Sequence, residues 1–306
     1  MQKIEQHSLN LAKWANLLMG AAGITAAIGS HASALMLDGL FSGVNFLAAV
    51  MAARVAASIQ KRPNALRPFG YEIDEPMYVM FRSLVLTGVI LVAGFGAIGK
   101  IIDYFGGVEM PIIRLDWIVA YMIAMVTICS FMAFWHHRNW LKTGHKSDLL
   151  KTERNAALID GVLSAAAGAA FLVISLLKGT VLDFLVPISD AIVVLGLTAY
   201  MIPRPIRGFV DAIKEVLGES AVPETVERWR RIIRDALNET AFTLIEVAVT
   251  KMGRSYFVVA YIRPDVPTSV EMLDDIRQKM ESVCSKIHMP SRMEIVYTGD
   301  YPYEDV

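Results

Sequence analysis

The sequence predicts a membrane protein with two parts, an all-α bundle of six membrane-spanning helices followed by a small cytoplasmic α+β domain. Three observations lead to this fold class. The 306 residues are 55% hydrophobic, with a mean hydropathy of +0.45, which is more apolar than a soluble domain of this size usually is. Six apolar segments have about the 20 residues that cross roughly 30 Å of hydrocarbon. Residues 14–53 contain only His31 and Asp38 as ionisable groups, whereas residues 204–306 are rich in charge.

The six predicted spans follow one another through short links. We place them at residues 12–30, 33–56, 77–102, 115–136, 155–177 and 181–202. The first two are separated only by the letters GSHAS, and the last two by the turn at Lys178-Gly179-Thr180. Links this short join antiparallel neighbours. Gly20 and Gly23 give the first span a small-residue face, which predicts close contact with another helix.

Lysine and arginine side chains predict the orientation, because cytoplasmic loops carry an excess of them. The N-terminus and the links after the second and fourth spans are basic, and the opposite side is poor in basic residues. The basic side carries Lys3, Lys13, Arg54, Lys61, Arg62, Arg67, Arg138, Lys142, Lys146, Lys151 and Arg154, and the other side Lys100, Arg114 and Lys178. We therefore predict an integral, multi-pass protein of the cell or inner membrane, with both termini in the cytoplasm.

The tail beyond the bundle is predicted to form a separate domain. The letters MIPRPIRGF end the sixth span with two prolines and two arginines, so we divide the chain into residues 1–206 and 207–306. The tail has the pattern αββαβ: a helix at 223–239, strands at 244–251 and 255–264 around a turn at Gly253, an amphipathic helix at 269–287 and a last strand at 292–298.

Several polar residues near the predicted span ends allow two interpretations. The link HHRNWLKTGH, residues 136–145, is interpreted as a solvated loop that faces lipid headgroups, with a metal site as the alternative. Trp140 within it, like Trp14, Trp117 and Trp135, is predicted to anchor the membrane interface. Asp190 either joins a cavity inside the bundle or caps a helix.

The segment SALMLDGLFSGVNFLAAVMAARVA, the segment RPFGYEIDEP and the six-span-plus-αββαβ architecture together resemble the cation diffusion facilitator family. Phe69, Gly70 and Glu75 match that family's motif at the start of span three. The resemblance covers nearly the whole chain. It implies a homodimer that exports a small cation, in this family a divalent metal, usually in exchange for protons.

The resemblance also shows where this chain departs from the family. The positions that hold the family's tetrahedral membrane site fall on Phe41, Asn45, Leu163 and Ala167, and only Asn45 offers a ligand atom. Arg67 and Tyr71 stand where the family's loop site has histidines. In the tail, Ala260 and Tyr297 occupy places where metal-sensing members carry histidine ligands.

A short motif that occurs on two of the predicted spans indicates a different cation site. LDGLFSGVN on the second span and IDGVLSAAA on the fifth each place a serine four residues after an aspartate, which puts the two on one helix face. A carboxylate inside the bilayer is costly and marks a functional site by default. We predict an all-oxygen cation site suited to hard cations. The alternative is that each aspartate caps a helix in water at the membrane edge. The predicted site residues are Asp38, Ser42, Asn45, Asp160 and Ser164.

These observations favour a secondary-active cation transporter, with cation/proton exchange through this oxygen-rich site. The alternative is a non-transporting membrane scaffold or partner subunit that has lost metal binding. A third, weaker hypothesis is a carrier of an organic or monovalent cation, with Phe41 as an aromatic wall. We expect a homodimer in contact with lipid and no cofactor beyond the transported cation or protons. The net charge of −1 gives no indication of a nucleic-acid partner, and we find no constellation of an enzyme active site.

Overall fold

The structure, a computed structural model, describes residues 2–59, 61, 63–142, 148–238, 240–286 and 291–302. The chain divides into two compact units. The first, called here the helical unit, comprises Met1–Ala53 and Arg82–Arg207. The second, called the sheet unit, comprises Arg54–Phe81 and Gly208–Val306, so it includes the link between the second and third predicted spans. The division into domains at residue 206 stays a prediction.

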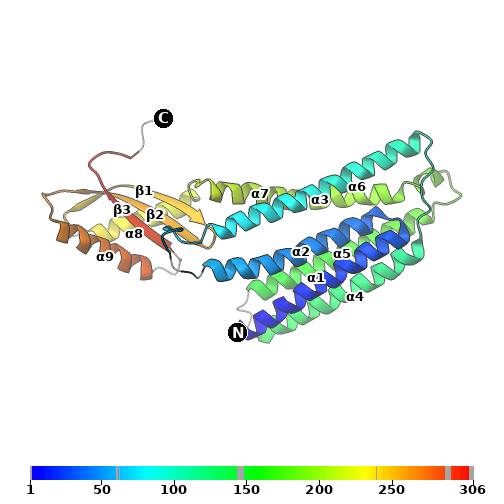
Figure 1. The fold of residues 1–306 in the computed structure, drawn as a ribbon, viewed down its shortest axis with the longest axis horizontal. Coiled ribbons are helices and arrows are strands. Elements are labelled where there is room, and N and C mark those ends of the chain that lie inside the picture. Colours follow the sequence, from blue (N-terminus) through cyan, green and yellow to red (C-terminus); the bar gives the residue numbers. More distant parts are fainter. Residues whose placement is uncertain are drawn as a thin grey trace. The chain divides into compact units, whose positions relative to one another are not determined.

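Five long helices confirm the first five predicted spans. They are α1 (Gln2–Ser30), α2 (Ser33–Ile59), α3 (Asp74–Phe105), α4 (Leu115–Lys142) and α5 (Asp148–Ser175). All five are long and apolar enough to cross a membrane. Within the helical unit, α1, α2, α4 and α5 run side by side (Figure 1). The first helix begins well before the predicted start at residue 12, because polar residues at a helix end need not interrupt its hydrogen bonding.

The sixth predicted span has a more complex structure. A short 3₁₀ helix (Asp183–Leu185) precedes α6 (Ser189–Met201), and α7 (Pro203–Val216) follows. The 13 residues of α6 rise only about 20 Å, which is less than the hydrocarbon thickness. Ile202 keeps helical dihedrals and its N–H donates to the Thr198 carbonyl at 3.0 Å. The helix therefore continues into α7, but a sixth span of full length stays a prediction.

Glycines bring α1 and α2 into backbone contact. A Cβ atom on Gly39 would lie 2.7 Å from the Ile24 amide nitrogen, and a Cβ on Gly23 would lie 2.6 Å from the Gly39 Cα. Side chains larger than hydrogen would therefore push the helices apart. The small-residue face predicted for the first span is confirmed. The contact also fixes the position of Asp38, the residue before Gly39.

The sheet unit confirms the predicted αββαβ order. Its elements are α8 (Pro223–Leu237), β1 (Phe242–Met252), β2 (Ser255–Pro264), α9 (Val270–Lys286) and β3 (Ser291–Tyr297). The strand order is β1-β2-β3, with β1 antiparallel and β3 parallel to β2. Gly253 takes a φ of 61° as the first residue of the two-residue β1–β2 turn, where glycine is favoured. Trp229, Ile233 and Val258 are fully buried in the core between the helices and the sheet.

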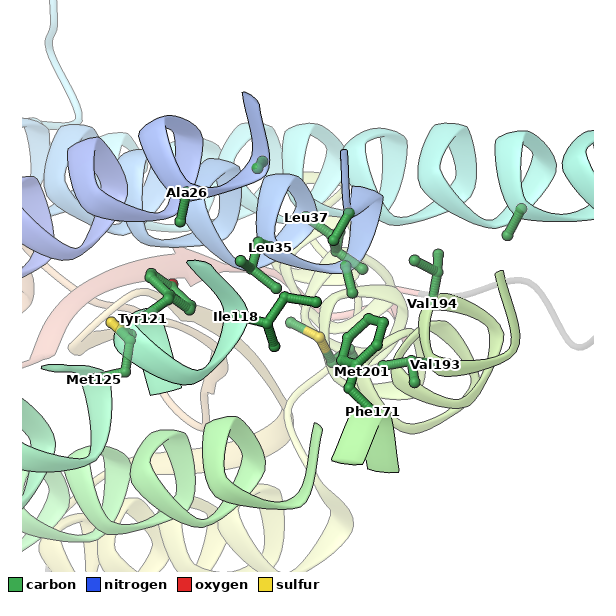
Figure 2. Packing of buried hydrophobic residues seen from close by; sticks show 14 of the residues in the cluster. Ala26, Leu35, Leu37, Ile118, Tyr121, Met125, Phe171, Val193, Val194 and Met201 are labelled. Carbon is green, nitrogen blue, oxygen red and sulfur yellow. The ribbon is translucent and has the colours of Figure 1, made fainter. Parts of the chain in front are cut away.

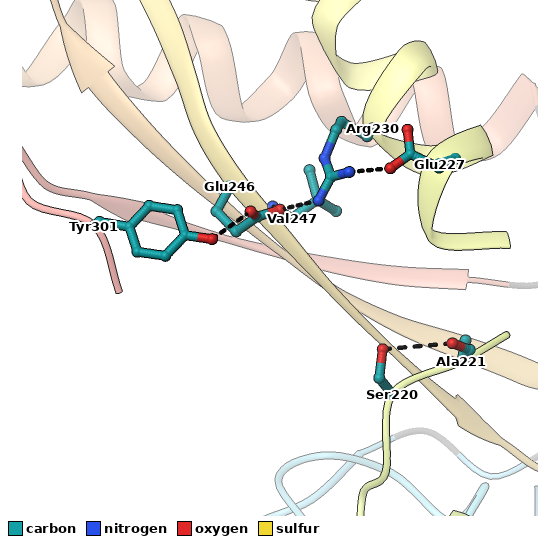
Figure 3. Close-up of polar contacts among 7 residues, drawn as sticks. All are labelled: Ser220, Ala221, Glu227, Arg230, Glu246, Val247 and Tyr301. Atoms are coloured by element: carbon teal, nitrogen blue, oxygen red, sulfur yellow. Dashed lines mark hydrogen bonds and ion pairs between the residues drawn. The ribbon is translucent and has the colours of Figure 1, made fainter. Parts of the chain in front are cut away.

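A carboxylate on β1 joins three parts of the sheet unit (Figure 3). Glu246 accepts hydrogen bonds from Arg230 of α8, from the Val247 N–H at 2.7 Å and from the Tyr301 hydroxyl at 2.9 Å. Burial alone would raise the pKa of Glu246, but these bonds outweigh burial and hold it below its ordinary value. Arg230 also pairs with Glu227, whose side chain is 60% exposed.

We expect Glu246→Gln to lower the free energy of unfolding of a fragment of residues 207–306 by about 1–2 kcal/mol at pH 7, because charge-assisted hydrogen bonds are lost. Since the pKa of Glu246 lies below its ordinary 4.5, the carboxylate stabilises the fold above pH 4.5, and this contribution disappears as the pH falls further. The difference between wild type and variant should therefore shrink below pH 4.5. Urea unfolding followed by the fluorescence of Trp229, the fragment's single tryptophan, measures it.

Glu227→Gln is the matched control, because it removes an exposed partner of the same arginine. Its effect should stay below about 0.5 kcal/mol. Equal losses of stability in the two variants would contradict the role given to Glu246.

Candidate functional site

A small cavity lies inside the helical unit, between α2, α4, α5 and α6. Its volume is about 30 Å³, enough for about two water molecules or a small cation. Most of the wall is apolar, and six of the wall residues are labelled in Figure 2 among the buried hydrophobic residues drawn there. These six are Leu35, Leu37, Ile118, Tyr121, Phe171 and Met201. Asp38 of α2 and Ser164 of α5 also line the cavity, so the structure brings together two of the five predicted site residues.

Asp38 is held in this cavity by hydroxyl groups. The Tyr121 hydroxyl donates to Asp38 Oδ2 at 2.7 Å, and the Ser164 side chain is a second hydrogen-bond partner of the same carboxyl group. Within the described part of the chain, no lysine or arginine forms an ion pair with Asp38. An ionised carboxylate in such surroundings needs a proton or a bound cation to neutralise it.

Asp160 lies close to this site but does not line the cavity. It stands one helical turn before Ser164 on α5, and its charge interacts with that of Asp38. Cys129 of α4 interacts with both carboxylates, which places it beside them. Arg204 supplies a compensating positive charge to Asp160, and no ion pair between the two is found among the described residues. The two acidic groups therefore belong to one region with different immediate surroundings.

Ser42 and Asn45 lie farther along α2. Asn45 is seven residues beyond Asp38, or about 10 Å along the helix axis, and its side-chain oxygen accepts a hydrogen bond from Arg82 at 2.9 Å. Ser42 is buried, with 5% of its surface exposed. Neither is among the residues that line the Asp38 cavity. Their part in a cation site stays a prediction.

The carboxylate of Asp190 has different partners from that of Asp38. Its Oδ1 accepts the Ala34 N–H at 2.9 Å, and its Oδ2 lies 2.6 Å from the Lys100 Nζ. The same ammonium group donates to the Ser33 hydroxyl at 2.6 Å. Asp190 therefore caps the start of α2, which favours the capping interpretation, and the cluster joins α2, α3 and α6. Because Asp190 caps the start of α2, Asp38 does not cap this helix.

Tyr121 was not singled out from the sequence, although a signal existed. A tyrosine within an apolar span needs a buried acceptor for its hydroxyl, and Asp38 is such an acceptor. The prediction of a solvated 136–145 link is wrong at His136. This side chain is 1% exposed, and its Nδ1 lies 2.8 Å from the Ser8 hydroxyl oxygen on α1. His145 lies outside the described residues.

Across the described residues, no group of three or more histidine, cysteine, aspartate or glutamate side chains is arranged to hold a metal ion. In the sheet unit, Ala260 is fully buried and the Tyr297 hydroxyl donates to the Leu273 carbonyl at 2.8 Å. Leu163 and Ala167, which occupy family ligand positions by resemblance, line the Asp38 cavity. The site can therefore offer oxygen atoms within apolar walls.

Residues 9–217, more than half of the chain, match the family model described as the cation efflux transmembrane domain. The matched range covers the five candidate spans from residue 9 onward, α6, α7 and the Asp38 cavity. No curated protein matches the chain.

We expect Lys100→Met to destabilise the protein by about 3–5 kcal/mol, because it leaves the buried Asp190 carboxylate without its partner. Asp190→Asn should cost less, since the Lys100 side chain is 33% exposed and can reach water. Thermal unfolding of the purified protein in detergent measures both. Lys178→Met, in the exposed turn after α5, is the matched control. An unfolding temperature of Lys100→Met equal to that of the control would contradict the role of the ion pair.

Proposed function

Because the chain belongs to the cation efflux family, and so is a cation transporter of the membrane, we propose that it exchanges a small cation for protons at Asp38. The observation that carries this proposal is a half-buried carboxylate that faces a cavity, accepts a tyrosine hydrogen bond and has no basic partner among the described residues. Cation and proton then compete for the same oxygen atoms. Binding of one releases the other, which couples the two fluxes.

The ligand atoms support a hard cation. Asp38, Ser164 and Tyr121 provide oxygen atoms only, and oxygen suits Na⁺, Mg²⁺, Ca²⁺ or Mn²⁺, whereas zinc sites usually include nitrogen or sulfur ligands. The charges of the neighbouring side chains favour one kind of cation among these. Asp38 alone balances one positive charge, and Asp160 is already compensated in part by Arg204. A monovalent cation therefore fits the charge of the cavity best.

A series of polar groups offers a route to this site. Asp160 interacts with Glu153, which lies about two helical turns earlier on α5, and Glu153 interacts with Arg82 of α3. Arg82 in turn donates to Asn45 of α2. We propose that these side chains line the path by which ions enter from the predicted cytoplasmic side. The Lys100–Asp190–Ser33 cluster closes the opposite side, and rocking of helix groups exposes the cavity alternately.

The assembly and the orientation complete the proposal. The lysine and arginine distribution supports cytoplasmic termini, and the resemblance to the family supports a homodimer. In this arrangement the sheet unit lies in the cytoplasm.

The test is cation flux into proteoliposomes under an imposed pH gradient, with Na⁺, K⁺, Mg²⁺, Mn²⁺ and Zn²⁺ offered in turn. We expect Asp38→Asn to lower the flux of the accepted cation at least tenfold, because the amide can neither hold the cation nor exchange a proton. Asp160→Asn should lower it less, since Asp160 lies beside the cavity. Asp103→Asn, at the exposed end of α3, is the matched control.

Undiminished flux in both Asp38→Asn and Asp160→Asn would remove these residues from the mechanism. If wild-type protein carries none of the five cations and binds none by calorimetry, the non-transporting scaffold becomes the better hypothesis for this chain.

Tyr121→Phe tests the hydrogen bond separately from the carboxylate. Loss of a bond to a charged group costs about 1.5 kcal/mol, which corresponds to roughly a tenfold change. We expect the KM for the cation to rise by about that factor while transport remains detectable. Tyr200→Phe on the exposed face of α6 is the control. Unchanged KM in Tyr121→Phe would show that the tyrosine does not position Asp38.

A further inference from the structure

A second hollow lies on the surface of the helical unit, in a groove between α4 and α5. Its volume is about 350 Å³, within the range of small-molecule sites. Ser130, Ala133, Phe134 and His137 line it from α4, and Arg154 and Leu158 from α5. The spacings i, i+3, i+4 and i+7 on α4 and i, i+4 on α5 place each set on one helix face. The groove runs about 10 Å along the helices.

The groove has a polar end and an apolar end. Arg154 and His137 lie near the link between the two helices, where α4 ends and α5 begins. Phe134, Leu158 and Ser130 lie deeper, toward the middle of both candidate spans. The side chains of Phe134 and Leu158 are exposed by 60% and 49% on helices that are long enough to cross a membrane. Their surroundings are therefore acyl chains, not water.

Arg154 is fixed at the polar end but has no acidic partner among the side chains that the structure describes. Nε and Nη2 donate to the Asn155 side-chain oxygen at 3.1 and 2.8 Å, and Nη1 donates to Nδ1 of His137 at 3.4 Å. All these acceptors are uncharged, and the described residues supply no carboxylate ion pair to this guanidinium. Two of its five N–H groups remain to donate. A preorganised guanidinium with spare donors is suited to a phosphate group.

Trp140 places this guanidinium at the level of the membrane interface. The Arg154 guanidinium lies 5.1 Å from the centre of the Trp140 ring, and the His137 ring lies 5.9 Å from the same ring. Tryptophan rings prefer the headgroup level of a bilayer. The polar end of the groove is therefore at headgroup depth.

We propose that this groove binds one anionic phospholipid, with its phosphate on Arg154 and one acyl chain along Phe134 and Leu158. Charge selects the occupant. Acyl chains of all bilayer lipids fit an apolar groove equally well, because a bilayer offers no hydrophobic gain for moving a chain from lipid to protein. Selectivity must therefore come from the guanidinium, which favours a headgroup with net negative charge. Anionic lipids are abundant in the cytoplasmic leaflet, the side predicted for this end of α4 and α5.

The test uses the full-length protein in detergent, titrated with phosphatidylglycerol or phosphatidylcholine, with lipid retention read by native mass spectrometry. Wild type should retain one phosphatidylglycerol in preference to phosphatidylcholine. Arg154→Gln should weaken phosphatidylglycerol binding roughly fivefold, the effect of one arginine at a charged membrane surface, and leave phosphatidylcholine binding unchanged. Arg138→Gln is the matched control, because it removes an exposed charge at the same end of α4 that does not line the groove.

Arg154→Lys provides a second variant that keeps the charge, and it should bind phosphatidylglycerol more tightly than Arg154→Gln does. Inorganic phosphate at millimolar concentration should not displace the lipid, because it lacks the acyl chain. Equal retention of the two lipids by wild type, or equal losses in Arg154→Gln and Arg138→Gln, would overturn the proposal. Complete displacement by inorganic phosphate would also overturn it, since the groove would then be a general anion site.

Discussion

A carboxylate among apolar helices must be neutralised inside the protein, and this constraint separates the acidic residues of the helical unit. Asp190 is neutralised by Lys100 and also caps α2, so its charge is used for structure. Asp38 receives hydroxyl groups but no cation from the described chain. Hydroxyl groups stabilise a carboxylate without cancelling its charge, which leaves it free to take up a proton or a cation. Two aspartates in similar helices thus differ in chemistry because of a single neighbouring lysine.

The position of Asp38 depends on contacts that hold the first turns of α2 from two sides. Asp190 and Lys100 hold Ser33 and Ala34 at the helix start, and the backbone contact at Gly23 and Gly39 holds α2 against α1. These contacts lie on either side of Asp38 along the chain. They leave the carboxylate little freedom except at its side-chain torsions. A binding group of this kind is most precise when it stands on a rigid helix.

The sequence predicted helices and strands well because hydrophobic periodicity depends on local spacing. Local spacing could not predict the side-chain contacts of the sites, because the partners are far apart in the sequence. Tyr121 and Asp38 are 83 residues apart, and Lys100 and Asp190 are 90 residues apart. The motif Asp-Gly-x-x-Ser predicted Asp38 and Ser164 correctly, because it occurs on two helices, α2 and α5, that line the same cavity. It could not show that Asn45, two turns further along α2, accepts a hydrogen bond from Arg82 of α3. The sixth span was least predictable, because its apolar letters begin at Val181, whereas α6 begins only at Ser189, after the short 3₁₀ helix and Pro187.

The apolar walls bear on which cation the cavity can hold. By resemblance, Leu163 and Ala167 stand at ligand positions of a site that binds divalent metal, and here both line the Asp38 cavity. With these ligands gone, a divalent ion beside Asp38 alone would carry a net positive charge within apolar surroundings, which is costly. A proton or a monovalent cation beside Asp38 leaves no such excess charge. On the function proposed above, the loss of the family ligands would change the charge of the ion that is taken up without abolishing transport.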